Sequence, residues 1–363
     1  MNGVARTVPR NTSVAERIRV LIVDDSLVIR HLIREALGSD PRIEIVGAEA
    51  NGAAALARIP ETKPDVVTLD VEMPVMDGLE TLRQIRKLHP KLRTIMFSTV
   101  TGRGASITLE ALALGADDYV TKAANAGSLD KSLYSLRSEL IPKIKQFFAP
   151  VAPLAKLQPP VVIQPPKFVG PRTKPDIVVI GVSTGGPNAL RSVIPKLPAN
   201  LPVPVIIVQH MPPMFTRLLA ERLDADSSLK VREAEDGMEL QPGLVIVARG
   251  DHHLRLRRSG TAVLTVLDQG PHENSCRPSV DVLFRSVAEI HGKHTLAVML
   301  TGMGSDGLLG TRALKITGAT SLVQDEASSV VWGMPGAVAA AGLADQILAL
   351  DRIPAEIVRL SMD

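Results

Sequence analysis

Five polar residues in the first third of the chain follow apolar runs. Asp24 and Asp25 close one run, Asp70 closes another, Ser98 closes a third, and Lys122 follows a further one. If the runs are neighbouring parallel strands, these side chains meet at one edge of a sheet. Three converging carboxylates repel one another unless a hard divalent cation, Mg²⁺ by ligand type, and a lysine neutralise them. A carboxylate in such a site can attack phosphorus to give an acyl phosphate, and the central Asp70 is the best candidate.

The elements that must position these residues alternate along the chain. Each apolar run is short enough to be a buried strand, and each is followed by apolar residues at helical spacing. Five strand–helix units predict a parallel sheet covered by helices on both faces. The strand patterns lie at 18–25, 43–50, 65–70, 94–99 and 116–122, and the last helix begins near Leu129.

These residues, taken together, resemble the receiver domain of response regulators. The matching pieces are the Asp pair at 24–25, the run DVEMPVMDG at 70–78, Ser98, and the Thr-Lys pair at 121–122. The resemblance implies a five-stranded, flavodoxin-like fold. One departure is Ala123, which stands where the family usually has proline, so the geometry of the loop after Lys122 is open.

The receiver resemblance also implies a role for each matching residue. Asp70 is the implied phospho-acceptor, and Ser98 and Lys122 are expected to bind the phosphoryl group. Tyr119 is the aromatic side chain implied to move with Ser98. The implied Mg²⁺ ligands are Asp24, Asp25, Asp70 and the backbone carbonyl of Glu72.

A second chemistry is indicated in the C-terminal half. Residues 176–190 read DIVVIGVSTGGPNAL, an apolar strand, a glycine-rich turn and the start of a helix. The stretch 181–185 fits G-x-S-x-G, in which a tight turn lifts a serine hydroxyl out of the sheet. The helix N-terminus behind it offers amides and a positive dipole to an oxyanion. Ser183 is therefore a candidate nucleophile, although a turn with a capping serine gives the same short pattern.

A serine nucleophile needs a base and an orienting acid. His210 ends the apolar run 203–210, one strand–helix unit after Ser183, so both side chains are expected at the same sheet edge. Asp306 lies in the glycine-rich turn that follows the apolar run from residue 295. The order Ser…His…Asp differs from the Ser…Asp…His order of α/β-hydrolases. It therefore disfavours that fold while keeping the logic of a catalytic triad.

Other interpretations of the C-terminal half remain open at this point. Residues 302–307 fit G-x-G-x-x-G, and Asp325 closes the next strand, which imitates a dinucleotide-binding fingerprint. A metal site at His252 and His253 is weaker, because neighbouring residues on a strand face opposite sides. Cys276 has the chemistry of a thiol nucleophile, but nothing nearby in the sequence supports that role.

Longer stretches of the C-terminal half resemble the protein-glutamate methylesterases of chemotaxis (the CheB family), in which a receiver is fused through a linker to an esterase domain. The resemblance implies Ser183 as nucleophile, His210 as general base and Asp306 as its partner. Thr184 and the Met303 amide are implied helpers of the oxyanion. Val182 and Cys276 differ from the residues usual in the family's motifs, but neither difference removes a reacting group. The matching stretches are GVSTGG at 181–186, QHMPPMFT at 209–216, RPSVDVLFRSVA at 277–288 and LTGMGSDG at 300–307.

The function implied by this family is hydrolysis of glutamyl methyl esters on methyl-accepting chemotaxis receptors, with deamidation of selected glutamines by the same acyl chemistry. A histidine kinase is the implied phosphodonor, and phosphorylation of Asp70 is expected to weaken a receiver contact over the esterase cleft. The alternatives are a non-catalytic, phospho-regulated signalling adaptor and a dinucleotide-binding enzyme. Neither nucleic acid binding nor direct membrane insertion is expected.

Composition sets the remaining limits. The chain has 363 residues, of which 45% are hydrophobic and 22% charged, so wholesale disorder is excluded. Aromatic residues make up 2%, which argues against base-stacking platforms for single-stranded nucleic acid. The single cysteine excludes an internal disulfide and fits a reducing compartment. With neither a signal peptide pattern nor a long apolar run, the expected location is the cytoplasm.

A proline-rich basic segment divides the chain. Residues 142–175 hold nine of the 27 prolines, six Lys or Arg residues and no Asp or Glu, so neither a helix nor a central strand is expected through them. The fold class is therefore α/β with two doubly wound parallel-sheet domains, a receiver and a larger methylesterase domain. The expected boundaries are a tail at 1–17, a receiver at 18–141, a linker at 142–175 and a catalytic domain at 176–363.

Overall fold

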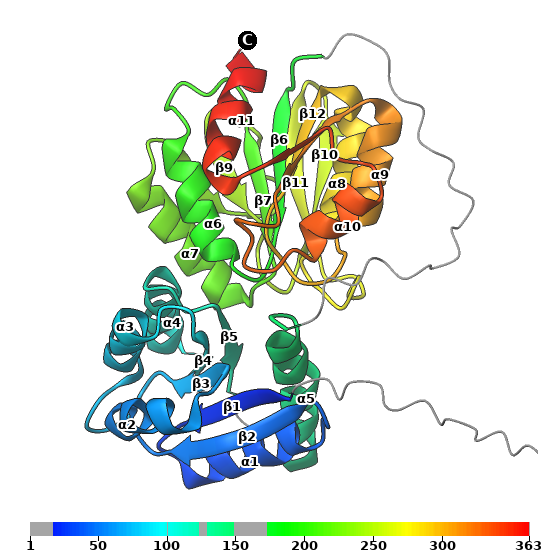
Figure 1. Cartoon of the computed structure of the whole chain (residues 1–363). Coiled ribbons are helices and arrows are strands. Elements are labelled where there is room, and N and C mark those ends of the chain that lie inside the picture. Colours follow the sequence, from blue (N-terminus) through cyan, green and yellow to red (C-terminus); the bar gives the residue numbers. More distant parts are fainter. Residues whose placement is uncertain (1–16, 100, 123–128, 149–172, 363) are drawn as a thin grey trace, which may run out of the picture. The chain divides into compact units, whose positions relative to one another are not determined.

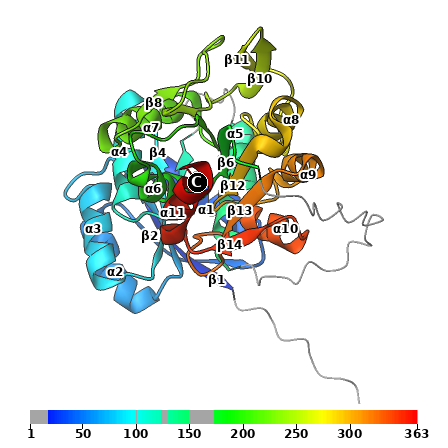
Figure 2. The ribbon, with the colours of Figure 1, turned by 90° about the horizontal axis from the view of Figure 1, so that it is seen from above.

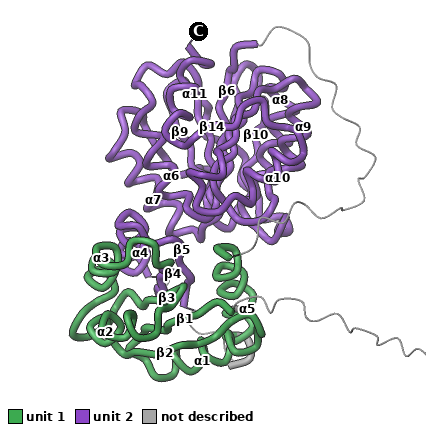
Figure 3. Tube along the Cα trace, in the orientation of Figure 1, with its two compact units in different colours: residues 1–93, 125–148 green, residues 94–124, 149–363 purple. Residues whose placement is uncertain are grey.

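The structure is a computed structural model that describes residues 17–99, 101–122, 129–148 and 173–362. Residues 1–16 of the predicted tail, the Ala123 position and most of the predicted linker therefore lie outside the described residues. The chain divides into two compact units, coloured separately in Figure 3. One unit holds residues 1–93 and 125–148, and the other holds residues 94–124 and 149–363.

The N-terminal sheet has five strands in the order β2-β1-β3-β4-β5, which confirms the predicted strand–helix alternation. The pairings of β1 with β2, β1 with β3, and β4 with β5 are all parallel. Figure 1 labels these elements along the chain. Their bounds are β1 (Ile18–Val23), α1 (Leu27–Gly38), β2 (Ile43–Glu49), α2 (Gly52–Thr62), β3 (Val66–Asp70), α3 (Gly78–Leu88), β4 (Arg93–Ser98), α4 (Gly102–Ala113), β5 (Asp118–Thr121) and α5 (Leu129–Lys145).

Short polar side chains fix where the helices of this sheet begin. Ser26 accepts a hydrogen bond from the Ile29 amide at the start of α1, and Asp77 accepts one from Glu80 at the start of α3. Such caps satisfy amides that the first helical turn leaves without partners. Because each helix starts soon after its strand, the acidic strand ends stay in short connections.

Helix α5 corrects the predicted start of the linker at residue 142. The helix runs through Pro142 and ends at Lys145, so its last turn contains the proline. Proline removes one amide donor, but the Gln146 amide still closes the final turn by donating to the Pro142 carbonyl at 3.0 Å. Leu140 and Ile144 are fully buried on either side of it, and this burial holds the turn in place.

The C-terminal sheet has seven strands in the order β14-β13-β12-β6-β7-β9-β8, and all its pairings are parallel. This confirms the larger α/β domain that the sequence predicts. The strand order reverses at β6, because the chain continues to β7 on one side and reaches β12 on the other. The strands are β6 (Ile177–Val182), β7 (Val205–Gln209), β8 (Lys230–Glu233), β9 (Leu244–Val247), β12 (Thr295–Met299), β13 (Thr320–Gln324) and β14 (Gln346–Leu348).

Helices cover both faces of this sheet, with α6, α7 and α11 on one side and α8, α9 and α10 on the other (Figure 1). An antiparallel hairpin of β10 (His253–Ser259) and β11 (Ala262–Asp268) lies beside α8 (Figure 2). None of the helices in the described ranges combines the length and apolar character needed to cross a membrane. The helices are α6 (Gly186–Val193), α7 (Pro213–Asp226), α8 (Val280–Ile290), α9 (Leu308–Thr317), α10 (Met334–Ala340) and α11 (Ile353–Met362), with 3₁₀ turns at Ile194–Lys196, Gly292–His294 and Leu350–Arg352.

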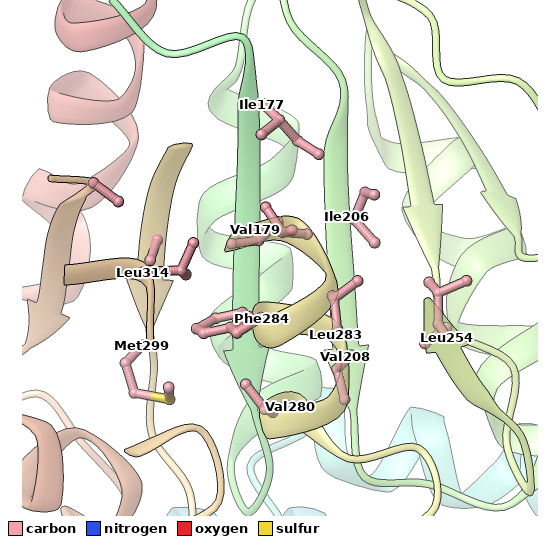
Figure 4. Packing of buried hydrophobic residues seen from close by; sticks show 14 of the residues in the cluster. Ile177, Val179, Ile206, Val208, Leu254, Val280, Leu283, Phe284, Met299 and Leu314 are labelled. Atoms are coloured by element: carbon pink, nitrogen blue, oxygen red, sulfur yellow. The ribbon is translucent and has the colours of Figure 1, made fainter. Parts of the chain in front are cut away.

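Helix α8 is packed into the hydrophobic core beside the larger sheet. Its residues Leu283 and Phe284 are fully buried, with Phe284 toward Val179 of β6 and Met299 of β12 and Leu283 toward Val208 of β7 (Figure 4). Truncation of a buried phenylalanine to alanine costs about 3–5 kcal/mol, so this packing fixes the position of the whole helix. The start of α8 is thereby held at the carboxyl end of β6.

Candidate functional site

Ser183 stands immediately after β6, where the strand order of the larger sheet reverses. Such switch points are where parallel sheets bind their ligands. Val182 is in register with Gln209 of β7, and the His210 amide donates to the Val182 carbonyl at 3.3 Å. On the other side, the Ser183 amide donates to the Thr301 carbonyl at 3.0 Å. Residues that follow three adjacent strands therefore come together at this edge of the sheet.

The glycines of this turn are explained by close packing. A Cβ built on Gly302 would lie 2.9 Å from the Ser183 Cβ, and one on Gly186 would lie 1.8 Å from the Gln209 side-chain oxygen. Gln209 in turn donates its amide to the Ser183 carbonyl at 3.0 Å. The G-x-G-x-x-G pattern that begins at Gly302 thus serves the approach of its turn to Ser183.

His210 and Asp306 form the central pair of the site. The His210 Nε2 lies 2.8 Å from the Asp306 Oδ2, and their side chains are 13% and 3% exposed. Burial lowers the pKa of His210, but the hydrogen bond with Asp306 and the contact with Cys276 outweigh it and raise that pKa above 6.5. Burial raises the pKa of Asp306, but the bonds from His210, Val280 and Ser279 outweigh it and hold that pKa below 3.8. The pair is therefore built to stabilise an imidazolium beside a carboxylate.

Asp306 is surrounded by further hydrogen-bond donors. The first amides of α8 point at its carboxylate, and the N-cap residue Ser279 donates its hydroxyl to Asp306 while making no side-chain cap bond to its own helix. Asp306 therefore takes the place of a capping side chain for α8, where the helix dipole favours negative charge. The donors besides His210 are Asn274 Nδ2 at 2.8 Å, Ser279 Oγ at 2.8 Å and the amides of Val280 at 2.6 Å, Asp281 at 3.2 Å and Gly307 at 3.0 Å.

The other ring nitrogen of His210 faces a thiol. Cys276 Sγ lies 3.5 Å from His210 Nδ1. Within the described part of the chain, the Ser183 hydroxyl makes no hydrogen bond, so the histidine–aspartate half of the predicted triad is formed and the serine–histidine half is not. Serine–histidine bonds are often long before substrate binds. Because Nε2 is held by Asp306, Nδ1 is the nitrogen that remains for the serine proton.

The two predicted oxyanion helpers differ in what they offer. The Thr184 hydroxyl donates to the Asp118 carboxylate at 3.0 Å in a buried contact, so in this structure it is engaged elsewhere. The Met303 side chain is exposed, and its amide donates no hydrogen bond to any residue that the structure describes. The Met303 amide is therefore the more available donor of the two.

Several residues of this site were missed in the sequence. Asn274 and Asp281 bond to one another at 2.9 Å, and Asp281 also accepts the Gly310 amide, which ties α8 to α9. A Ser followed by apolar residues at helical spacing is an N-cap signal, so Ser279 could have been recognised as a cap but not as a donor to Asp306. His253 is buried and bonds to the Pro271 carbonyl and the Ser279 amide, which fits support of the site rather than metal binding.

The receiver acids form a second cluster. Ligand oxygens of Asp24, Asp25 and Asp70 lie within 4.8 Å of one another, with Asp24 and Asp70 buried and Asp25 exposed. The Ser26 amide donates to Asp24 at 2.9 Å, and the Glu72 amide donates to Asp70 at 3.5 Å. A set of only carboxylate oxygens fits a hard cation such as Mg²⁺.

The remaining predicted receiver residues lie at the ends of β4 and β5. Ser98 is fully buried, and the Lys122 amide donates to its carbonyl at 2.6 Å. Tyr119 on β5 is 7% exposed, and its ring stacks on Phe215 of α7 with centroids 4.8 Å apart. Both rings belong to the unit that holds residues 94–124 and 149–363.

Comparison with known proteins identifies both parts of the chain. Residues 178–357 match the sequence family described as CheB methylesterase, and residues 20–134 match the response regulator receiver domain. A relative from Trichodesmium erythraeum, named protein-glutamate methylesterase/protein-glutamine glutaminase, is 50% identical over 347 residues, which cover 94% of this chain and 99% of the relative. The chain belongs to the CheB methylesterase family. A CheB relative of the same name from Thermotoga maritima is 43% identical over 348 residues, covering 94% of this chain and 98% of the relative.

A solved structure agrees with this assignment. The crystal structure of the Thermotoga maritima CheB methylesterase catalytic domain is 47% identical, with a TM-score of 0.51. The match covers 52% of the present chain and 100% of the Thermotoga maritima chain. Membership of the CheB family confirms the resemblance predicted from the sequence, and it does not favour the adaptor or the dinucleotide enzyme.

Proposed function

We propose that this protein hydrolyses glutamyl methyl esters on methyl-accepting chemotaxis receptors and deamidates selected glutamines by the same chemistry. The observation that carries the proposal is the hydrogen-bonded pair of a partly buried His210 and a buried Asp306, at the same edge of the larger sheet as Ser183. The names of the CheB relatives support the substrate class.

The mechanism follows from the atoms around Ser183. Asp306 orients the imidazole through Nε2 and stabilises the imidazolium that forms, so Nδ1 of neutral His210 takes the proton of Ser183. Ser183 attacks the γ-carbonyl of the ester, and the Met303 amide stabilises the developing oxyanion. Methanol leaves with the proton from His210, and water then hydrolyses the acyl-enzyme.

The acid cluster of the receiver supports control by phosphorylation. Asp70 would accept a phosphoryl group from a histidine kinase, with Asp24, Asp25 and the Glu72 carbonyl holding Mg²⁺. When bound, Mg²⁺ neutralises charge on the phosphoryl oxygens. Ser98 and Lys122, at neighbouring strand ends, would bind the same oxygens.

The contacts of Asp118 with Thr184 and of Tyr119 with Phe215 suggest how the signal is transmitted. A movement of Tyr119 with Ser98 removes the stack on Phe215 and releases the Thr184 hydroxyl. The phosphorylated state then favours an accessible Ser183, which is a shift between two populations. We further propose that the protein acts in the cytoplasm, where its kinase and the receptor segments that carry glutamyl esters meet it.

The test measures methanol released from methylated receptor fragments, with and without a small phosphodonor and Mg²⁺. We expect wild-type release to rise with the phosphodonor and Ser183→Ala to lose release by about 10⁴-fold or more. Asp70→Asn should keep the basal rate and lose the stimulation.

Each variant tests a separate part of the proposal. Unchanged release by folded Ser183→Ala would exclude the serine mechanism. Full stimulation of Asp70→Asn would exclude gating through that residue. Failure of the wild type to release methanol under any condition would favour a non-catalytic adaptor, and labelling of Ser183 by a serine-reactive probe would then decide between an adaptor and another ester substrate.

A further inference from the structure

The thiol beside the catalytic histidine is held by a rigid turn. The Glu273 amide donates to the Cys276 carbonyl at 3.1 Å, and the Cys276 amide donates back to Glu273 at 2.9 Å. Between them Asn274 and Ser275 have φ values of 53° and 63°, the left-handed conformations of a type I′ turn. Asparagine adopts this region readily, but Ser275 does so at some strain, so the turn must be held from outside.

Two anchors hold the turn. Glu273 forms a paired salt bridge with Arg285 of α8, with nitrogen–oxygen distances of 2.7 and 2.6 Å. Asn274 donates to Asp306 at 2.8 Å and to Asp281 at 2.9 Å. Because α8 and Asp306 anchor Glu273 and Asn274, and Cys276 pairs with Glu273, the Cys276 thiol is held near His210 rather than left to a loose loop.

The arrangement around His210 is that of a metal-binding histidine. The Nε2 atom of His210 donates to the Asp306 carboxylate, which leaves the lone pair of the neutral imidazole on Nδ1. Metal-ligating histidines commonly donate their other N–H to a carboxylate in this way. The Nδ1–Sγ distance of 3.5 Å also fits, because tetrahedral Zn²⁺ with bonds of about 2.0–2.1 and 2.3 Å separates such ligands by about 3.5 Å.

We propose that His210 and Cys276 together bind Zn²⁺ and that the bound ion inhibits the esterase by occupying the nitrogen that must accept the Ser183 proton. The inhibition rests on the proposed function, whereas the binding does not. On binding, the Cys276 thiol and the His210 imidazolium each lose a proton to solvent, sulfur and Nδ1 then each donate a lone pair, and water fills the remaining positions.

The chemistry of the pair selects the ion. A thiolate and an imidazole favour Zn²⁺ over Mg²⁺, whose ligands are oxygens. Asp306 belongs to the same cluster of possible ligands, but its Oδ2 bonds to Nε2 at 2.8 Å, not to Nδ1, so it orients the histidine rather than supplying a third ligand. Cys276 is partly exposed and His210 is 13% exposed, so an ion can reach them from solvent.

The first experiment titrates Zn²⁺ into the full-length protein and measures methanol release as a fraction of each variant's own metal-free rate. We expect micromolar Zn²⁺ to inhibit the wild type and a chelator to restore it. Cys276→Ser and Cys276→Ala should need at least about tenfold more Zn²⁺, because one of two protein ligands is lost. His272→Gln, an exposed histidine four positions away, is the matched control and should stay as sensitive as the wild type.

The second experiment detects the metal without any substrate. Co²⁺ replaces Zn²⁺, and a thiolate-to-metal absorption band in the near ultraviolet reports the Cys276 ligand. Binding at the receiver carboxylates cannot give this band. We expect it in the wild type and in His272→Gln, and its loss in both Cys276 variants.

The two experiments separate the proposals. A thiolate band with no methanol release by any protein would overturn the esterase and leave the metal site standing. Absence of the band in folded wild-type protein, or equal Zn²⁺ sensitivity of the wild type and both Cys276 variants, would overturn the metal site.

Discussion

The two candidate sites occupy the same place in the same kind of sheet, yet they handle carboxylates in opposite ways. In the receiver, three acids, Asp24, Asp25 and Asp70, converge to within 4.8 Å at strand ends. In the catalytic domain, one acid, Asp306, is met by amides, a hydroxyl and an imidazole. The first site concentrates like charge, and the second surrounds a single charge with donors.

This difference separates a responsive site from a prearranged one. Converging carboxylates gain from a cation, so the state of the receiver site depends on what binds it. Asp306 is already satisfied, so its orientation of His210 needs no ion and no conformational change. We therefore expect Mg²⁺ to act on stimulation and to leave the basal esterase rate alone.

The largest expected effect comes from Asp306→Asn. An asparagine no longer stabilises the imidazolium and can favour the wrong tautomer of His210, so kcat should fall by about 10⁴-fold while the protein stays folded. Methanol release and thermal melting measure the two quantities. Asp325→Asn, the same change in the loop after the next strand, should keep the wild-type rate, and a comparable loss in that variant would argue against a special role for Asp306.

Asp25→Ala tests the responsive side of the comparison. Loss of one of three carboxylates should weaken Mg²⁺ binding by about tenfold or more. The measurement is the Mg²⁺ concentration needed for half-maximal stimulation by a phosphodonor. Asp77→Asn is the control, because asparagine caps α3 as well as aspartate does. An unchanged Mg²⁺ requirement in Asp25→Ala would remove that residue from the ion site.

A smaller loss is expected from Ser279→Ala, which deletes one donor to Asp306. A hydrogen bond to a charged group contributes about 1.5 kcal/mol or more, so kcat/KM should fall about tenfold. Ser286→Ala, on the same helix, removes a hydroxyl that bonds to the Leu256 amide. It should lower the melting temperature without lowering kcat/KM. Equal kinetic losses in the two variants would mean that Ser279 only stabilises α8.

The smallest effect is a pH dependence of stability. The pKa of His210 is raised from 6.5 to about 10, so its contribution is fully present below pH 6.5 and is lost as pH rises through about 10. His210→Gln should therefore lower the melting temperature by about a few degrees at pH 6 and by less at pH 10. The exposed control His272→Gln should show a difference that is flat with pH. Wild-type methanol release should rise over the same range, as His210 loses its proton, and a flat rate would contradict the base role.

Sequence reasoning found what strand ends and short motifs reveal. The alternation of strands and helices, the convergence of Asp24, Asp25 and Asp70, and the pairing of His210 with Asp306 follow from residue types placed after apolar runs. Because the carboxyl ends of neighbouring parallel strands lie at one edge of the sheet, these residues could be grouped without the structure.

Other contacts between residues far apart in the chain could not be predicted from the sequence. Cys276 lies 66 residues from His210 in the chain, and its type I′ turn is set by residues in the left-handed region rather than by a glycine. Helix α5 continues past Pro142 because the burial of Leu140 and Ile144 outweighs the loss of one hydrogen-bond donor. A prediction based on the proline alone does not include this burial.

The capping of α8 by Asp306 bears on any attempt to move this chemistry to another scaffold. Serine, histidine and aspartate grafted alone would leave the carboxylate with one partner, free to rotate and to take up a proton. The smallest transferable part would be the three proposed catalytic residues together with the first turn of α8 and the asparagine turn before it. The position of Asp306 thus depends on the fold around it, and a homologue with a shortened N-terminus of α8 would need other hydrogen-bond donors for this carboxylate.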